Sequence, residues 1–341
     1  MICLASDNFA PAHPLIMEAI LEANNGFSGA YGADPWTEEA EQLIQQIFKR
    51  QCRVLMVPTG TGANVLAIKL ACRRYESVIC SDISHMQYQE AGAAESIAGC
   101  KLLTVPHQNG KIELEAVQKK IQRERAFGRH STSPRILSIT QPTEVGTVYS
   151  LEEVKSLSDL CREEKLFLHM DGSRIYNASV HLNSSLDELV QHLDLLSLGG
   201  TKNGLVQAEA LLIFNSLLQD GHDYLHKQTL QLVSKMRYIS AQYIALLREG
   251  LWHQLASQAN QKAQEIAAAI KKNPHVSLCY PVQTNQIFFS VPFSWIPMIQ
   301  EKVLCYPWDR EKHELRFIAS WCTTEQDVER VRALFAELPS H

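Results

Sequence analysis

The sequence predicts an α/β protein whose large domain is built on a mostly parallel central sheet, followed by a smaller C-terminal α+β domain. Up to Asn215, apolar runs of strand length alternate with segments of helical periodicity. Repeated β-α-β units need right-handed crossovers, which place helices on both faces of a parallel sheet. Beyond Asn215 a long helical stretch gives way to short strands. We expect an N-terminal arm and large domain at 1–240 and a small domain at 241–341.

The predicted elements of the large domain follow from local patterns. Ala40 to Phe48 has apolar residues at helical spacing. Apolar runs bracketed by polar turns predict strands at 53–57, 78–80, 101–105, 135–139, 166–170 and 193–198. Helices are expected at 63–73, 90–97 and 114–125. Another begins at Ser150, because Glu153 three residues later completes a capping-box pattern.

In the C-terminal part the regular alternation of strands and helices ends. A helical stretch is expected from about Gln219 to Lys272, interrupted near Gly250. Short strands are expected at 276–279, 286–291, 303–306 and 314–320. Thr323 with Gln326 is expected to cap a last helix that runs to Leu338.

Composition limits the functional classes. The 341-residue chain has a net charge of −5 with acids and bases interspersed, so no basic run favours a nucleic-acid partner. No apolar run approaches the ~20 residues that span a bilayer, and no signal-like start is present, so we expect no membrane association. Nine cysteines stand singly without a Cys-x-x-Cys pair, which indicates neither a disulfide framework nor a metal site. We therefore expect a cytoplasmic enzyme without a metal.

Two polar motifs end neighbouring predicted strands. Lys202 lies in Gly199-Gly-Thr-Lys-Asn-Gly204, and Asp171 lies in His169-Met-Asp-Gly-Ser-Arg174. A lysine on a glycine-rich loop can form a Schiff base, and an aspartate from the adjacent strand can reach the far side of a ring held by that lysine. Pyridoxal 5'-phosphate (PLP) needs this pair, one amine for its aldehyde and one carboxylate for its pyridine nitrogen.

A glycine-rich turn offers a place for the phosphate. Pro58-Thr-Gly60-Thr61-Gly-Ala-Asn64 stands between a predicted strand and helix, where free N–H groups and the positive end of the helix dipole attract anions. The turn lacks the Gly-Lys-Ser/Thr of a P-loop and the Gly-x-Gly-x-x-Gly of dinucleotide sites. A tight turn without a ligand is the alternative interpretation.

His85 follows the strand at 78–80. A lone histidine there is most simply a polar loop residue. At the carboxyl edge of a parallel sheet, where ligands bind, its imidazole could lie on a cofactor ring or act as a base with a reference pKa of about 6.5.

Taken together, these motifs resemble the threonine aldolases of the β-eliminating lyase group, within the PLP enzymes of the aspartate aminotransferase fold (fold type I). The resemblance runs nearly end to end. Its motifs, in chain order, are Ser6-Asp7-Asn8, Tyr31-Gly-Ala-Asp34-Pro35, residues 58–64, His85, Asp171-Gly-Ser-Arg174, Gly199-Gly-Thr-Lys202-Asn-Gly204 and Glu314-Leu-Arg316-Phe317.

The resemblance implies roles for the matched cofactor positions. Lys202 would hold PLP as a Schiff base, Asp171 would pair with the ring nitrogen, and His85 would stack on the ring face. Gly60 and Thr61 would bind the phosphate. As an alternative for Lys202, a surface amine is disfavoured by the flanking glycines and the apolar strand before it.

The resemblance also implies substrate and partner contacts. The substrate carboxylate would be bound by a hydroxyl and two guanidinium groups, those of Ser6, Arg174 and Arg316. For Arg316 alone, an exposed strand position is the simpler interpretation. Tyr31 is expected to reach the active site of a neighbouring subunit, and Lys227 and Arg237 to approach the partner's cofactor phosphate. A homodimer, or a homotetramer of two dimers, is therefore expected.

The implied reaction is retro-aldol cleavage of L-threonine, L-allo-threonine and other β-hydroxy-α-amino acids to glycine and an aldehyde. His85 is the first candidate for the base that takes the hydroxyl proton, and His130 is an alternative. Another PLP-dependent lyase or a racemase would use the same lysine and aspartate, and a PLP-binding protein without activity stays open. A dehydrogenase is disfavoured because the dinucleotide fingerprint is missing. The segment Asn203 to Glu209 departs from the small residues expected after the lysine.

Overall fold

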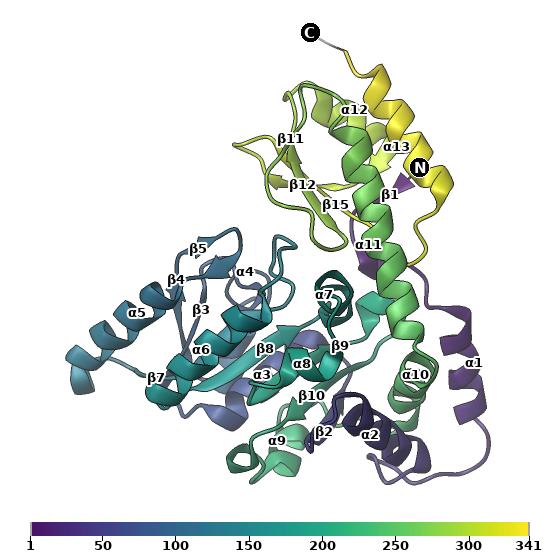
Figure 1. Ribbon diagram of the computed structural model, residues 1–341. Coiled ribbons are helices and arrows are strands. Elements are labelled where there is room, and N and C mark those ends of the chain that lie inside the picture. The colour runs from purple at the N-terminus through teal and green to yellow at the C-terminus, as the bar shows by residue number, and fades with distance from the viewer. Residues whose placement is uncertain (1, 340–341) are drawn as a thin grey trace.

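The computed structural model describes residues 2–339 and has a seven-stranded sheet at its centre (Figure 1). The strands lie in the order β2-β10-β9-β8-β7-β3-β4. Their bounds are β2 Arg53–Val57, β3 Glu76–Ser81, β4 Lys101–Val105, β7 Ser133–Thr140, β8 Phe167–Gly172, β9 Leu195–Gly199 and β10 Glu209–Ile213. β10 is antiparallel to both of its neighbours, and the other pairs are parallel. The predicted mostly parallel sheet is confirmed.

Helices cover both faces of this sheet because alternate side chains of each strand point to opposite sides. Leu55 and Val57 of β2 pack in one apolar cluster, whereas Val54 and Met56 pack in the other. The first face is covered by α3 (Gly60–Ala71), the π-helical turn η2 (Ala94–Ala98) and α9 (His222–Gln228). The second is covered by α2 (Pro35–Ile47), α5 (Leu114–Ala126), α6 (Leu151–Glu163), α7 (Ile175–Leu182), α8 (Leu186–Val190) and α10 (Arg237–Arg248), with α1 (Pro14–Ala23) against α10.

The C-terminal part has its own apolar cluster and its own sheet. This antiparallel sheet has the order β11-β12-β15-β14, with β11 Ser277–Leu278, β12 Gln286–Ser290, β14 Tyr306–Asp309 and β15 Glu314–Ile318. It packs with α12 (Trp295–Lys302) and α13 (Glu325–Glu337). The helix α11 (Leu251–Ile270) runs from the large sheet to the small one (Figure 1).

The start of the chain lies with this C-terminal part. β1 (Ile2–Cys3) pairs in parallel with β13 (Val303–Leu304), and Ile2 and Leu4 pack in the C-terminal cluster. The chain then returns to the large sheet through the short helix η1 (Asp7–Phe9). The division at residues 240 and 241 stays a prediction, but the first residues contact the other side of that boundary.

Four local predictions need correction. No α-helix spans 90–97, because Ala91 and Gly92 are left-handed (φ +51° and +70°). The short helix α4 (His85–Tyr88) ends before them, and the π-helical turn η2 begins after them. The stretch 219–272 is three helices, since Leu230 is left-handed (φ +66°) after α9. The expected strand 303–306 divides into β13 and β14.

The fourth correction concerns the cap of the last helix. The capping box of α13 is formed by Thr324 and Asp327, one residue beyond the expected pair Thr323 and Gln326. Thr323 instead accepts the N–H of Ser320 through its hydroxyl. The capping box predicted for Ser150 and Glu153 is confirmed at α6.

The remaining short elements are connections: β5 His107–Gln108, β6 Lys111–Ile112, η3 Gly128–His130, η4 Thr201–Asn203 and η5 Ser216–Leu218. Within residues 2–339, no helix has both the length and the apolar character needed to cross a bilayer.

Candidate active site

A cavity of about 690 Å³ opens at the carboxyl ends of the large-sheet strands and is closed from the other side by the C-terminal domain. Five of the predicted site residues line it: Ser6, His85, Arg174, Lys202 and Arg316. Tyr306 and Trp308 of β14 form part of the opposite wall. The cavity therefore joins residues from the first turn of the chain, from three loops of the large sheet and from the small sheet.

Lys202 lies in η4, on the turn after β9. Glycine is required on both sides of this turn: a Cβ on Gly200 would lie 2.4 Å from Leu205 Cδ1, and Gly204 is left-handed with φ +89°. Burial and the nearby Arg174 guanidinium lower the pKa of Lys202. A lowered pKa increases the fraction of neutral amine, which is the nucleophile that forms an imine.

Glu209, at the start of β10, binds the backbone of the turn that carries Lys202. Its two carboxylate oxygens accept the N–H groups of Gly200 (3.2 Å) and Thr201 (3.3 Å). Burial raises the pKa of Glu209 to about 7. The segment Asn203 to Glu209, which lacks the expected small residues, thus ends in a buried acid that fixes the lysine turn.

Asp171 lies at the end of β8, one strand away from Lys202. Its Oδ1 accepts the N–H of Ser173 at 3.0 Å, and its Oδ2 accepts Asn64 Nδ2 at 2.9 Å. Burial raises its pKa, but the Lys202 ammonium and the Asn64 hydrogen bond lower it more, so the pKa of Asp171 stays below its ordinary value. The group is therefore a carboxylate that can accept a hydrogen bond or pair with a cation.

His85, at the start of α4, belongs to a chain of polar contacts that ends at Asp171. His85 Nδ1 lies 2.8 Å from Glu90 Oε1, and the same oxygen accepts Asn64 Nδ2 at 2.9 Å. Asn64 also donates to Asp171, as described above. Glu90 and Asn64 are buried, and this chain fixes the orientation of the His85 ring relative to Asp171.

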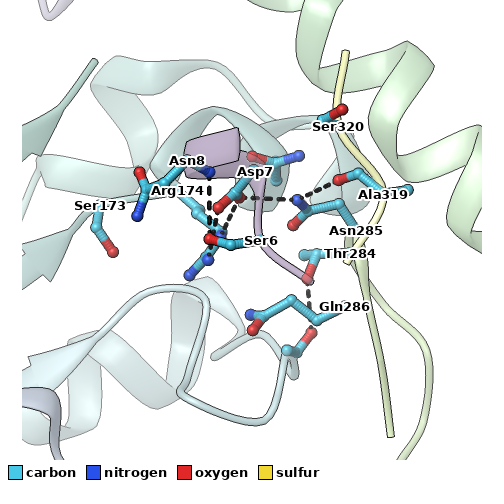
Figure 2. Close-up of polar contacts among 12 residues, drawn as sticks. Ser6, Asp7, Asn8, Ser173, Arg174, Thr284, Asn285, Gln286, Ala319 and Ser320 are labelled. Atoms are coloured by element: carbon cyan, nitrogen blue, oxygen red, sulfur yellow. Dashed lines mark hydrogen bonds and ion pairs between the residues drawn. The ribbon is translucent and has the colours of Figure 1, made fainter. Parts of the chain in front are cut away.

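The two predicted arginines, Arg174 and Arg316, line the same part of the cavity, which we call the arginine corner. Figure 2 shows Arg174 bound to Asp7. Arg174 donates to Asp7 through Nε (2.6 Å) and Nη2 (3.0 Å), and Asn285 Nδ2 donates to the same carboxylate at 3.1 Å. Arg316 donates to the carbonyl of Ala5 at 3.3 Å, while its buried Nε has no partner among residues 2–339.

Electrostatics make this corner a place for an anion. Burial and the neighbouring Arg174 guanidinium lower the pKa of Arg316, which means that its positive charge is under-compensated. Asp7 supplies one negative charge for the two guanidinium groups. The hydroxyl-bearing Ser6 lines the same corner. A ligand carboxylate would supply the second negative charge and accept hydrogen bonds from both arginines.

The phosphate turn has the expected position at the N-terminus of α3. Thr59 caps the helix, with its hydroxyl accepting the N–H of Gly62 at 3.0 Å. A Cβ on Gly60 would meet no heavy atom within 4 Å, so the space beside it is open among the described residues. Gly60 and Thr61 lie outside the lining of the main cavity. They present a helix N-terminus, as an anion site requires.

Besides Asp171, Gly60 and Thr61, four more of the predicted residues lie outside the cavity lining: Tyr31, Lys227, Arg237 and His130. Tyr31 is exposed and its ring lies 4.7 Å from Lys227 Nζ, so these two are brought together. Arg237 packs near Trp36 and Tyr238 and donates to the carbonyl of Gly26 at 3.1 Å. His130 lies on the exposed turn η3, away from the cavity lining.

Sequence reasoning missed several polar residues of the site. Asp7 and Asn64 lie inside the motifs at 6–8 and 58–64, and their place in these motifs was the available signal. Glu90 follows His85 at a distance of five residues, which a short helix can bring together. Glu144 and Asn285 carried no local signal, because their positions depend on the tertiary fold.

The residues present suit pyridoxal phosphate. A lysine of lowered pKa borders the cavity, a buried carboxylate lies one strand away, and an open helix N-terminus can bind phosphate. Buried polar atoms without partners in residues 2–339 surround the same region, including Asn64 Oδ1 and Glu90 Oε2. Such orphaned atoms are uncommon in a native core and indicate a polar ligand or water.

Comparison with known proteins agrees with this geometry. Residues 4–293 match the family model of the β-eliminating lyases. The chain is 38% identical to the low specificity L-threonine aldolase of a Pseudomonas species, over 98% of this chain and 96% of the relative. The relative of the same name from Pseudomonas aeruginosa is also 38% identical over the same shares.

Solved structures give the same result. The threonine aldolase of Leishmania major superposes with a TM-score of 0.95 at 27% identity, covering 99% of both chains. A putative L-allo-threonine aldolase of Listeria monocytogenes, at 19% identity, shares the fold with a TM-score of 0.74 over 98% of this chain and 95% of that one. The predicted fold is confirmed, and the chain belongs to the β-eliminating lyase family of PLP-dependent enzymes.

Proposed function

We propose that this protein is a lyase that cleaves L-threonine, L-allo-threonine and other β-hydroxy-α-amino acids to glycine and an aldehyde, with PLP as its cofactor. One observation carries the proposal: the Lys202 amine and the arginine corner line the same cavity. An amino acid bound there has its amine beside the lysine and its carboxylate at the arginines. The Pseudomonas relative named as a low specificity L-threonine aldolase supports this choice of substrate.

The cofactor contacts follow from the positions described. Lys202 would bind the aldehyde group of PLP, and Asp171 would accept a hydrogen bond from the protonated nitrogen of the PLP ring. The free N–H groups at the start of α3, at Gly60 and Thr61, would bind the phosphate. His85, oriented by Glu90, would lie on the ring face.

The substrate contacts decide which bond is weakened. Arg174 and Arg316 would bind the carboxylate of the amino acid, with Ser6 as a further hydrogen-bond partner. Fixing the carboxylate would restrict rotation about the Cα–N bond, and this restriction would select the Cα–Cβ bond for cleavage. The cofactor, when bound, supplies an electron sink for the pair left at Cα. Removal of the β-hydroxyl proton then releases the aldehyde.

The first experiment tests cofactor and reaction together. The purified protein is scanned for an absorbance band of bound PLP, then incubated with L-threonine while acetaldehyde and glycine are measured. A band with both products in equal amounts supports the proposal. A band without acetaldehyde would replace it by a racemase or another lyase of the same family, and no band after addition of PLP would refute the cofactor assignment.

We also propose a homodimer, or a homotetramer built from two dimers, in which Tyr31, Lys227 and Arg237 complete the partner's site. The exposed aromatic and aliphatic side chains near this region support an interface: Leu21, Phe27, Tyr31, Tyr224 and Leu230. The cation–aromatic contact of Lys227 with Tyr31 keeps two of the three residues together. The cytoplasmic location stays a prediction from the nine singly placed cysteines.

A further inference from the structure

Glu144 is an acid in the wall of the cavity that the roles described above do not use. It follows β7 in the chain and lines the cavity with Lys202 and His85. Its side chain is partly exposed to that space, while the residues on either side of it, Thr143 and Val145, are buried. The carboxyl group is therefore held by the protein and accessible to a ligand.

One of its two oxygens is fully engaged and the other is open. Oε1 accepts the hydroxyl of Thr140 at 2.7 Å and the backbone N–H of His85 at 3.0 Å. Oε2 has no hydrogen-bond partner among residues 2–339. It is also not among the fully buried atoms, so it is accessible from the cavity. The two bonds to Oε1 fix the plane of the carboxyl group, and Oε2 remains for a proton donor in the cavity.

The surroundings suit proton transfer near neutral pH. Burial raises the pKa of Glu144 to about 7, against the lowering effect of the Thr140 hydrogen bond and with a further raising effect of Asp171. A general base is most effective when its pKa lies near the working pH. Perturbed carboxyl groups of this kind concentrate at functional sites.

His85, the other candidate base, is more constrained. Its Nδ1 contacts the carboxylate of Glu90, and its backbone N–H donates to Glu144. The contact with Glu90 holds the imidazole in one orientation, as the proposed position on the ring face requires. The same backbone bond holds Glu144 beside it, so both residues face the cavity from adjoining positions.

We infer that Glu144 is the catalytic residue that takes the proton of the substrate β-hydroxyl through Oε2. This inference rests on the proposed function, because it assigns a role within that reaction. In the step, the O–H bond breaks and its proton moves to Glu144 Oε2. The O–H electron pair becomes the second bond of the aldehyde C=O, and the Cα–Cβ pair stays at Cα of the glycine fragment. Glycine gains a proton at Cα, and Glu144 returns its proton to solvent.

The test uses Glu144→Gln, which keeps the size of the side chain and cannot accept the proton. Glu144→Asp keeps the acid and shortens its reach. Glu152→Gln, at an exposed position on α6 outside the cavity, is the matched control for loss of one charge. Each holoenzyme is assayed for threonine cleavage and for exchange of the glycine α-proton in D₂O, a reaction that involves no β-hydroxyl.

A second readout does not depend on turnover. The dissociation constant of glycine is measured for each variant by calorimetry, and bound PLP is measured by absorbance. These values show whether the cavity and the cofactor are intact. They are expected to differ by less than about threefold between Glu144→Gln and the wild type, since glycine has no hydroxyl to contact Glu144.

The expected result is a fall of about 100-fold or more in kcat for threonine with Glu144→Gln. Glycine binding, α-proton exchange and bound cofactor stay within about threefold, and Glu152→Gln behaves as wild type. A fall of less than about tenfold would overturn the inference, as would a parallel loss of glycine exchange. If wild-type protein releases no acetaldehyde from threonine, the proposed function itself fails, which is a distinguishable outcome.

Discussion

Asp7 and Arg174 form a buried, two-pronged ion pair that connects the first helical turn of the chain to the end of β8, at 2.6 Å and 3.0 Å. The Asp7 side chain is 1% exposed and the Arg174 side chain 14% exposed. Asn285, from the C-terminal part, donates to the same carboxylate. The proposed substrate arginine is thus oriented by residues from both ends of the chain.

Replacing Asp7 with Asn is expected to weaken both stability and substrate binding. Arg174 keeps its burial but loses its counter-charge, and removing one partner of a buried pair costs about 3–5 kcal/mol. The KM for threonine should rise by about tenfold or more, because the guanidinium is no longer held in place. Urea unfolding and steady-state kinetics measure the two effects. Asp159→Asn, at an exposed ion pair, is the control and should change neither.

Lys202→Ala is expected to remove the visible absorbance band of bound PLP and all measurable cleavage of threonine. Among residues 2–339, two lysines line the cavity, Lys202 and Lys312, and the Lys312 side chain is largely exposed. The fold should persist, since Lys202 is not part of the apolar clusters among the described residues. Absorbance, circular dichroism and acetaldehyde release together test this. Wild-type activity in the variant would contradict the assignment of the lysine.

Asn64→Leu is expected to disconnect His85 from Asp171. The amide donates to Glu90 and Asp171 at 2.9 Å each, and both acceptors are buried. Hydrogen bonds to charged groups contribute about 1.5–3 kcal/mol each, so a loss of about 3 kcal/mol in unfolding free energy is expected. PLP affinity should fall as well, which an absorbance titration measures. Unchanged stability would mean that water replaces the amide.

The raised pKa of Glu144 predicts a pH-dependent stability of the apoenzyme. The pKa is 4.5 in the unfolded chain and about 7 in the fold, so between these values the folded state binds more protons. Stability from this group is present below the unfolded pKa and is lost as the pH rises through about 7. Its titratable neighbours are Asp171, Cys80, Tyr149 and the adjoining His85.

Glu144→Gln removes this dependence. Relative to wild type, the variant should gain about 2–3 kcal/mol in unfolding free energy between about pH 5 and pH 8. Urea unfolding of both apoproteins at the two pH values measures the difference, in which the titrating groups that do not interact with Glu144 cancel. Equal pH profiles would show that Glu144 is ionised over the whole range.

Mixed dimers test the shared site. Subunits with Lys202→Ala and subunits with Tyr31→Ala are each expected to be nearly inactive alone. If Tyr31 acts in the partner's site, a hybrid dimer has one site with both native residues, and a mixture at equal amounts recovers about 25% of wild-type activity. No recovery, with exchange of subunits shown by sizing of tagged chains, would place Tyr31 in its own subunit's site.

The central sheet could be predicted because its strands are short apolar runs separated by helices, and β-α-β order leaves few topologies. The errors occurred where a single backbone angle decides. Leu230 and Ala91 adopt left-handed φ values, which are uncommon for leucine and alanine and so cannot be predicted from the residue type. Each interrupts an otherwise helical pattern. The pairing of β1 with β13 depends on two-residue strands, which carry almost no periodicity.

The same distinction holds for the site. Asp171 could be predicted because it lies at the end of a strand and is followed by glycine, and Lys202 because it lies on a turn with glycines on both sides, just after the neighbouring strand. Glu144 and Asn285 could not, because nothing in their local sequence marks them and because each depends on a contact with a distant segment, at His85 and at Asp7.

The pairing of β1 with β13 has a consequence for synthesis on the ribosome. Residues 2 and 3 are synthesised long before their strand partners at 303 and 304. Asp7 receives its contact from Asn285 only after residue 285 has been made, and the arginine corner is complete only after Arg316. The large sheet can form earlier from local β-α-β units, but contacts of such long sequence separation form late. An incomplete chain can thus collapse around its central sheet while remaining unable to bind an amino acid, so synthesis itself delays activity until the last strands are present.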